Sequence, residues 1–188
     1  MTQLRCTIHD LELMPEDGSR YEIIDGELYV STQPSLEHQI VCLNTAAELR
    51  SWSHDTRAGV VVFAPGVIFA EHEAVAPDVV WVSQQRLAAL VGPDRKLHAA
   101  PDLMVEVLSP GPENERRDRE VKLKQYSRWG VREYWIVDWQ QRQVAVYCRE
   151  GAVLQLAETL LEGDVLESRL LPGFSCPVSR FFTDLAAS

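Results

Sequence analysis

The sequence predicts an α/β protein in which a mixed β-sheet is flanked by helices. Short runs rich in β-branched residues alternate with helical stretches along the whole chain. The dipeptide Asp25-Gly26, which suits a tight hairpin turn, separates two such runs near the N-terminus. An apolar strand, a charged helix and a second apolar strand follow one another over residues 100–138. We expect one domain, residues 1–188, because this length can enclose a substantial core.

The N-terminal half is expected to form a hairpin, a long helix and several short strands. Residues 1–19 are polar and predict loop or a short irregular helix. Ser35 is a suitable N-cap for a helix whose apolar stripe continues to about Trp52. The other expected elements are a hairpin at 21–30, two strands within 59–70 broken at Pro65-Gly66, a strand at 77–82 and a short helix at 84–90.

The C-terminal half continues with strands around one charged helix. That helix follows the strand at 101–108 and is expected to end at Gly130, a residue that favours helix termini. After it we expect strands at 132–138 and 143–148, a strand at 151–157 that pairs back as a hairpin, and a short helix near 181–186. These elements form the extra C-terminal strands and the tail of the predicted fold.

Composition limits the function classes. A net charge of −10 argues against a protein that simply coats nucleic acid, because Lys and Arg carry that affinity. No apolar run is long enough to span a bilayer and no secretory signal is visible, so a cytoplasmic location is expected. Cysteine spacing indicates reduced structural thiols and neither a zinc site nor a disulfide framework, at Cys6, Cys42, Cys148 and Cys176.

Glu106 and Lys122 are the first candidate site residues. Glu106 lies inside an apolar strand, where an unpaired charge is costly, so it requires a metal ion, a cation or a hydrogen-bond network. On a wheel of the next helix, Lys122 falls with Asp118, Tyr126 and Trp129 on the face that points to the core, while the basic residues Arg116, Arg117, Lys124 and Arg128 fall on the opposite face. Spacing alone favours a structural ion pair and a catalytic role about equally.

Asp78 provides a second carboxylate at the entrance of the strand before Glu106. Two carboxylates that converge with a lysine are typical of a site that holds Mg²⁺ or Mn²⁺ for phosphodiester hydrolysis. Such an ion polarises the phosphate, and the lysine acts on a water molecule or on the charge of the transition state. Asp78 alone is more typical of a strand-entry residue, but together with Glu106 and Lys122 it favours a site.

Several segments in a fixed order carry a resemblance to a known family. They begin at Tyr21 to Glu27 and include Pro34, His38 and Pro77-Asp78-Val79, as well as residues 101–110, 130–138 and 171–174 and the four-residue spacing of Asp118, Lys122 and Tyr126. In this order the chain resembles the PD-(D/E)XK nuclease superfamily, and more narrowly the Uma-type family of bacterial endonucleases. The resemblance implies a restriction-endonuclease-like core with an N-terminal hairpin.

The resemblance also implies roles for single residues. Asp78 matches the motif aspartate and Glu106 the motif acid, and the backbone carbonyl of Val107 would help them to hold the metal. The superfamily lysine two residues after the acid is absent, because Leu108 stands there, and Lys122 is the position that replaces it. Glu22 is either a third acid that reaches the metal or a cross-strand partner in the hairpin.

The resulting prediction is a Mg²⁺- or Mn²⁺-dependent endonuclease that hydrolyses phosphodiester bonds in nucleic acid, with DNA as the expected substrate. The basic helix side and the first long helix supply candidate backbone contacts, namely His38, Arg117, Lys124 and Arg128. A homodimer is expected, with apolar surface offered by the C-terminal strands and by Phe174, Phe181 and Phe182. The alternative is a non-catalytic interaction or assembly module that keeps the fold, in which Lys122 only neutralises Glu106.

Overall fold

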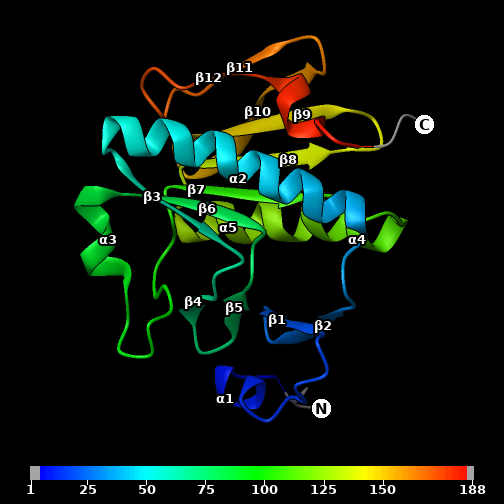
Figure 1. The fold of residues 1–188 in the computed structure, drawn as a ribbon. Helices are drawn as coiled ribbons and strands as arrows, with labels where there is room; N and C mark the ends of the chain where they lie inside the picture. The colour runs from blue at the N-terminus through cyan, green and yellow to red at the C-terminus, as the bar shows by residue number, and fades with distance from the viewer. Residues whose placement is uncertain (1–4, 186–188) are drawn as a thin grey trace.

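A six-stranded mixed sheet forms the centre of the computed structural model, which describes residues 5–185 (Figure 1). The strand order is β10-β9-β8-β7-β6-β3, and every neighbouring pair is antiparallel except β7 and β8. The strands are β3 (Gly59–Phe63), β6 (Val79–Ser83), β7 (Leu103–Val107), β8 (Glu133–Asp138), β9 (Gln143–Glu150) and β10 (Val153–Leu161). This arrangement is the predicted mixed sheet.

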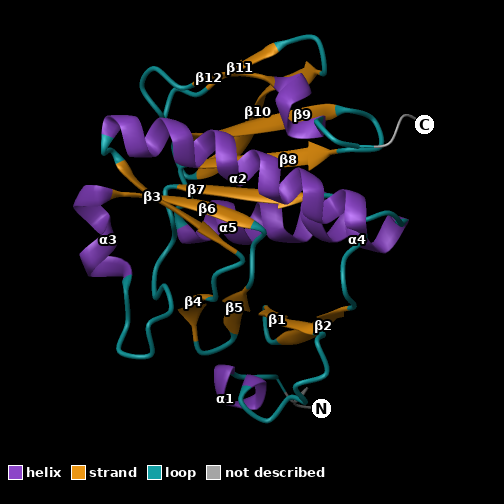
Figure 2. Ribbon diagram, viewed as in Figure 1, coloured by secondary structure: helices purple, strands orange, loops and turns teal. Residues whose placement is uncertain are grey.

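Helices cover both faces of this sheet because its strands alternate between two apolar clusters. In β6, Val79 and Trp81 pack on one face with α2 (Leu36–Thr56), whereas Val80 and Val82 pack on the other. That second face contacts the helical segment made of α4 (Pro112–Arg116), the π-helix η1 (Arg117–Lys122) and α5 (Leu123–Trp129). Figure 2 shows α2 crossing in front of the sheet and α5 passing behind it.

A smaller four-stranded sheet, β2-β1-β5-β4, lies beside the short helix α1 (Ile8–Leu11). It contains the predicted hairpin, β1 (Arg20–Ile24) and β2 (Glu27–Ser31), together with β4 (Val67–Ala70) and β5 (Glu73–Val75). Asp25 and Gly26 both have positive φ, 52° and 79°, as the tight turn between β1 and β2 requires. The pairing of Ile23 with Ala74 joins the hairpin to β5, which was not predicted.

The C-terminal segment packs back on the α2 face. It comprises the strand pair β11 (Val165–Glu167) and β12 (Ser175–Pro177) and the 3₁₀-helix η2 (Val178–Phe182). The short helix predicted near 181–186 thus lies a few residues earlier, and Ala186 falls outside the described residues. Within residues 5–185 no helix has the length and apolar character that a membrane crossing requires.

Most other predicted elements agree with the structure to within a few residues. The helix α3 (Gln84–Leu90) has the predicted bounds, and Ser35 caps α2 by accepting a hydrogen bond from the backbone N–H of His38 at 3.3 Å. That helix continues four residues beyond Trp52, to Thr56. The strands β11 and β12 were missed, because three-residue strands carry too little periodicity to be recognised.

Asp102 ties the start of β7 to the end of β6 through a buried carboxylate. It accepts hydrogen bonds from the backbone N–H of Ser83 at 2.9 Å and from the guanidinium groups of Arg86 at 2.8 Å and Arg132 at 3.2 Å. Burial would raise the pKa of Asp102, but the Ser83 N–H and the Arg86 guanidinium outweigh burial and hold this pKa below its ordinary value. Asp102 in its ionised form therefore stabilises the fold.

We expect Asp102→Asn to lower the free energy of unfolding by about 1.5–3 kcal/mol at pH 7, the range for a hydrogen bond to a charged group. Because the pKa is lower in the folded state, the benefit of ionisation is present above the unfolded pKa of about 3.9 and disappears as the pH falls through the folded value. Urea unfolding of both proteins from pH 7 to pH 3 measures this. A difference between the two that stays constant below pH 4 would contradict the expectation.

Candidate active site

Asp78 and Glu106 converge because of the register of two neighbouring strands. Val79 in β6 pairs with Val105 in β7, so Asp78 lies opposite Glu106 one step further along the antiparallel ladder. Directly opposed residues on such strands project their side chains to the same face. Asp78 is 2 % exposed and Glu106 is also 2 % exposed, so both carboxylates enter the protein interior.

Three donors hold the Asp78 carboxylate. Its Oδ1 accepts a hydrogen bond from Nη1 of Arg20 at 2.8 Å, and its Oδ2 accepts one from the backbone N–H of Val107 at 2.9 Å. Nε2 of His38 lies 3.3 Å from the same Oδ2. Burial would raise the pKa of Asp78, but His38 and Arg20 together lower it below the ordinary range. Asp78 is therefore a fixed, ionised carboxylate at neutral pH.

Glu106 has a different environment from Asp78. Its Oε1 accepts a hydrogen bond from Nζ of Lys122 at 3.0 Å and another from the hydroxyl of Tyr126 at 2.6 Å. Burial raises the pKa of Glu106 to about 8; the Lys122 charge opposes this rise and the Asp78 charge adds to it. The two carboxylates on adjacent strands thus have pKa values pushed in opposite directions, which is typical of functional sites.

Lys122 is buried among carboxylates, as the helical wheel predicted. Its Nζ lies 3.0 Å from Glu106, 3.1 Å from Oε1 of Glu22 and 3.6 Å from Oδ1 of Asp118. Burial would lower the pKa of Lys122, but these carboxylates outweigh burial and hold it above the ordinary value. Glu22 also accepts a hydrogen bond at 2.9 Å from the backbone N–H of Ala76, which follows β5 and lies outside the hairpin, so this contact is not the predicted cross-strand pair.

These side chains line one cavity of about 310 Å³ between α2, the hairpin and η1. Its charged lining residues are four carboxylates and three cations, namely Glu22, Asp78, Glu106, Asp118, Arg20, Arg117 and Lys122, and Val107 also borders it. Oδ1 of Asp118 is buried without a hydrogen-bond partner. This oxygen lies 3.6 Å from both Nζ of Lys122 and Nε of Arg117 but accepts no hydrogen bond, and such an oxygen beside further carboxylates fits a hard divalent cation such as Mg²⁺ or Mn²⁺.

A π-helical turn corrects the predicted position of Arg117. The wheel placed it on the solvated side, yet its side chain is only 13 % exposed and donates from Nη1 to Oγ of Ser31 at 2.6 Å. Residues 117–122 form η1, where hydrogen bonds join residues five apart, so Arg117 is carried to the side of Lys122. The wheel assumed 100° per residue, and it places Asp118, Lys122 and Tyr126 correctly but not Arg117.

The other candidate contact residues lie in different surroundings. His38 is buried at 4 % exposure between Asp78 and Cys42, whereas Lys124 is exposed on the helix surface. Arg128 is exposed and forms an ion pair with Asp25 at 2.9 Å. Of the four predicted contacts, only His38 and Arg117 border the cavity.

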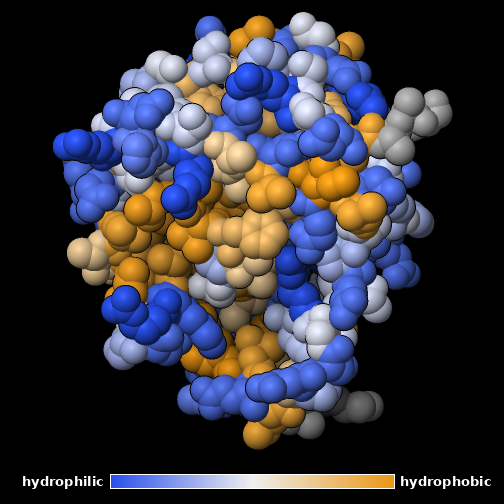
Figure 3. Space-filling view, viewed as in Figure 1, coloured by the Kyte–Doolittle hydropathy of each residue, from blue (hydrophilic) through white to orange (hydrophobic). Residues whose placement is uncertain are grey.

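The predicted apolar surface of the C-terminal segment is present on its strands but not at its phenylalanines. Phe174, Phe181 and Phe182 are buried in the cluster on the α2 face, so they contribute to the core and offer no surface for a partner. Exposed large apolar side chains lie on the C-terminal strands, at Val153, Leu156 and Leu161 of β10 and Val165 of β11, and also on α2, at Leu36 and Leu43. Apolar patches lie over α2 on the face seen in Figure 3.

Sequence reasoning missed two residues that complete the site. Arg20 contacts Asp78 from the start of β1, and no local pattern marks it because the two residues meet only through the tertiary fold. Tyr126 was predicted to face the core, but its hydroxyl contact with Glu106 was not foreseen. Its position four residues after Lys122 was the available signal, since residues at that spacing share a helix face.

A second possible ligand group shares Asp78. Ligand atoms of His38, Cys42 and Asp78 all lie within 4.8 Å of one another. Nδ1 of His38 lies 3.4 Å from Sγ of Cys42, and Nε2 is directed to Asp78. Because the two ring nitrogens point to different partners, this group resembles a hydrogen-bonded support for Asp78 more than a metal site. Burial also raises the pKa of Cys42, which disfavours the thiolate that a metal requires.

Comparisons with known proteins identify the family and a shared fold. Residues 8–179 match the model of the Uma2 family, described as "Putative restriction endonuclease". A crystal structure of a "putative nuclease belonging to DUF820" from Anabaena variabilis matches with a TM-score of 0.76 and 17 % identity, over 94 % of this chain and 97 % of that chain. At this identity the likeness shows the fold alone.

A second solved structure, the type IIG restriction endonuclease BpuSI, matches with a TM-score of 0.40 and 17 % identity. That match covers 77 % of this chain but 15 % of the other. Among curated proteins, none matches the chain.

Proposed function

Since this chain belongs to the Uma2 putative restriction endonuclease family, we propose that it is a Mg²⁺- or Mn²⁺-dependent endonuclease that hydrolyses phosphodiester bonds, with DNA as substrate. The observation that carries the proposal is the cavity in which Lys122 contacts Glu106 at 3.0 Å while Asp78 stands on the adjacent strand. A purely structural ion pair does not require four carboxylates around one open space. The proposal takes residues 1–188 as one domain, since both sheets supply residues to this cavity.

Asp78 and Glu106 would hold the ion, with the carbonyl of Val107 and an oxygen of Asp118 or Glu22 beside them. When bound, a divalent ion supplies Lewis acidity to a phosphate oxygen and lowers the pKa of a coordinated water. His38 and the N–H of Val107 orient the Asp78 carboxylate. Tyr126 and Lys122 orient that of Glu106.

Lys122 acts as a cation in this proposal. Its raised pKa keeps it protonated at neutral pH, so it does not serve as a general base. A buried ammonium group beside the reacting phosphate stabilises the negative charge that develops in the transition state. Arg117, Lys124 and Arg128 remain the proposed contacts to the nucleic-acid backbone, whereas both ring nitrogens of His38, the fourth candidate, face protein partners.

The first test is nicking of supercoiled plasmid with Mn²⁺ or Mg²⁺ by the wild type and by Asp78→Asn. We expect Asp78→Asn to lower the nicking rate roughly 10²-fold or more. The variant would bind the ion more weakly, and this removes several kcal/mol of transition-state stabilisation. Asp102→Asn, which removes an equally buried aspartate outside the cavity, is the matched control and should keep the activity. Equal nicking by all three proteins would identify a contaminant and contradict the proposal.

The alternative function is a non-catalytic nuclease-fold module that binds or assembles with a partner. One observation favours it: the three cations of the cavity already pair with its carboxylates, so Lys122 could serve only to neutralise Glu106. A thermal shift separates the two functions. The nuclease predicts stabilisation of the wild type by Mn²⁺, and the module predicts no shift.

A cytoplasmic homodimer completes the proposal. The family description implies a nucleic-acid substrate, and enzymes that cut both strands of a duplex commonly act in pairs. The exposed apolar side chains of β10 and β11 offer surface for such a pair, whereas Phe174, Phe181 and Phe182 are buried.

A further inference from the structure

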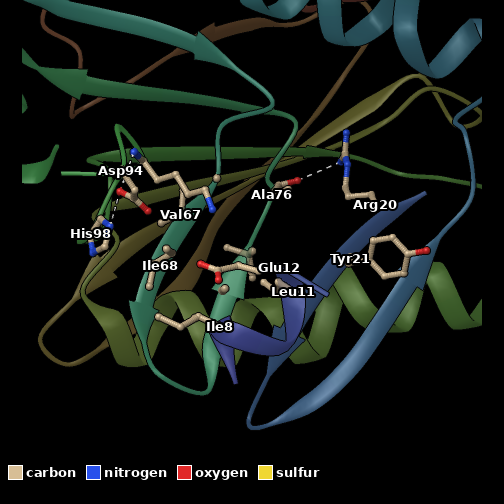
Figure 4. A pocket seen from close by; sticks show the side chains of 14 residues that line it. Ile8, Leu11, Glu12, Arg20, Tyr21, Val67, Ile68, Ala76, Asp94 and His98 are labelled. Carbon is tan, nitrogen blue, oxygen red and sulfur yellow. Dashed lines mark hydrogen bonds and ion pairs between the residues drawn. The ribbon is translucent and has the colours of Figure 1, made fainter. Parts of the chain in front are cut away.

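Arg20 occupies a position at the cavity that the proposed reaction does not explain. Its Nη1 donates to Oδ1 of Asp78 at 2.8 Å and to the backbone carbonyl of Ala76 at 3.0 Å. The side chain is 29 % exposed, so solvent reaches part of it. Arg20 also lines a second cavity of about 370 Å³, and Figure 4 shows it at the edge of that cavity with its bond to Ala76. Arg20 therefore borders both cavities.

The contacts of Asp78 leave little room for a metal ion. Oδ2 already accepts from the N–H of Val107 and faces His38, and Oδ1 accepts from Arg20. An ion that coordinates Oδ1 would stand within a few ångströms of the guanidinium. Two cations at that distance in a partly buried site repel each other strongly, because the local dielectric is far below that of water.

The charge balance of the cavity independently indicates that a metal ion alone is unfavourable there. Its lining holds four carboxylates against three cations, Arg20, Arg117 and Lys122. With every carboxylate ionised, as metal binding requires of its ligands, a divalent ion would leave one positive charge in excess. One phosphodiester group carries a single negative charge and would restore neutrality. The cavity is thus balanced for an ion together with a phosphodiester, and unbalanced for the ion alone.

We propose that Arg20 competes with the divalent ion for Asp78 and passes to the substrate phosphodiester, so that metal and substrate bind cooperatively. The inference rests on the proposed function and adds a substrate contact that the sequence did not indicate. Linkage requires the coupling to be reciprocal: the ion strengthens phosphodiester binding by the same factor by which the phosphodiester strengthens ion binding. Without substrate, Arg20 keeps the metal affinity low.

Arg20→Gln tests the competition directly. We expect the variant to bind Mn²⁺ in the absence of nucleic acid roughly tenfold more tightly than the wild type, because one nearby positive charge is gone. Free Mn²⁺ is measured by electron paramagnetic resonance during titration. Arg86→Gln is the matched control, since Arg86 also pairs with a buried aspartate at 2.8 Å but lies outside the cavity. Unchanged or weaker Mn²⁺ binding by a folded Arg20→Gln would overturn the proposal.

A second measurement uses only the wild type, in case Arg20→Gln does not fold. Mn²⁺ titrations are compared with and without a short phosphorothioate DNA duplex, corrected for the Mn²⁺ that the duplex itself binds. Tighter Mn²⁺ binding with this duplex, and none of the gain with an uncharged methylphosphonate duplex, supports the proposal. Equal affinity in all three conditions overturns it but leaves the nuclease intact. No Mn²⁺ binding in any condition removes the proposed function as well.

Discussion

Glu106→Gln is expected to abolish Mn²⁺-dependent nicking without destabilising the protein. The amide keeps the shape of the side chain and can still accept from Tyr126 and Lys122, but it is a poor ligand for a hard cation. The nicking rate should fall roughly 10³-fold or more, because without this carboxylate ligand the protein no longer holds the ion that supplies Lewis acidity. Plasmid nicking and the Mn²⁺ thermal shift should disappear together.

The stability of Glu106→Gln should depend on pH in a defined direction. Burial raises the pKa of Glu106 to about 8 in the folded protein, above its ordinary value of 4.5. A carboxyl group whose pKa is higher in the folded state stabilises the fold fully at pH values below its unfolded-state pKa. This stabilisation is lost as the pH rises towards 8. In metal-free protein, Glu106→Gln should therefore gain stability relative to the wild type between pH 5 and pH 8. Urea unfolding in EDTA measures it, and a relative loss over this range would contradict the assigned pKa.

Lys122→Met is expected to destabilise the protein by about 3–5 kcal/mol, the range for removing one partner of a buried ion pair. The ammonium group is 1 % exposed, and its loss leaves Glu22, Glu106 and Asp118 close together without their common cation. Because whole domains are stable by only about 5–15 kcal/mol, this single change could leave a marginal fold. Urea unfolding at pH 7 gives the value.

Two further variants make the Lys122 result interpretable. Lys124→Met changes the same residue type on the same helical segment at an exposed position, and should stay within about 0.5 kcal/mol of the wild type. The double variant Lys122→Met/Glu106→Gln removes one carboxylate with the cation and should recover part of the loss, with a coupling of about 0.5–3 kcal/mol. If Lys122→Met proves as stable as Lys124→Met, the buried cluster contributes nothing to the fold.

The sequence predicted the elements whose signals are local. The turn at Asp25-Gly26, the cap at Ser35 and the stop at Gly130 each act through neighbouring residues, so the hairpin, α2 and α5 could be placed. Nearly continuous apolar runs placed β6, β7 and β8, because both faces of that sheet are buried. Strands of three residues, such as β5, have no periodicity to read.

The site was predictable only in part, for the same physical reason. Lys122 and Glu106 could be paired because one helix and one strand adjoin along the chain, and burial of both charges required a partner. Arg20 and Arg117 could not be placed. Arg20 contacts Asp78 only through the tertiary fold. The position of Arg117 depends on a π-helical turn that residue preferences do not predict.

The carboxylates around Lys122 come from distant parts of the chain, Glu22 in the first hairpin and Glu106 in a central strand. Contacts between residues far apart in sequence form late in folding, after the loops between them have closed. An ammonium group cannot leave water before its partners arrive. A newly synthesised or partly unfolded chain therefore has no assembled cavity, and any activity of this cavity requires the completed fold.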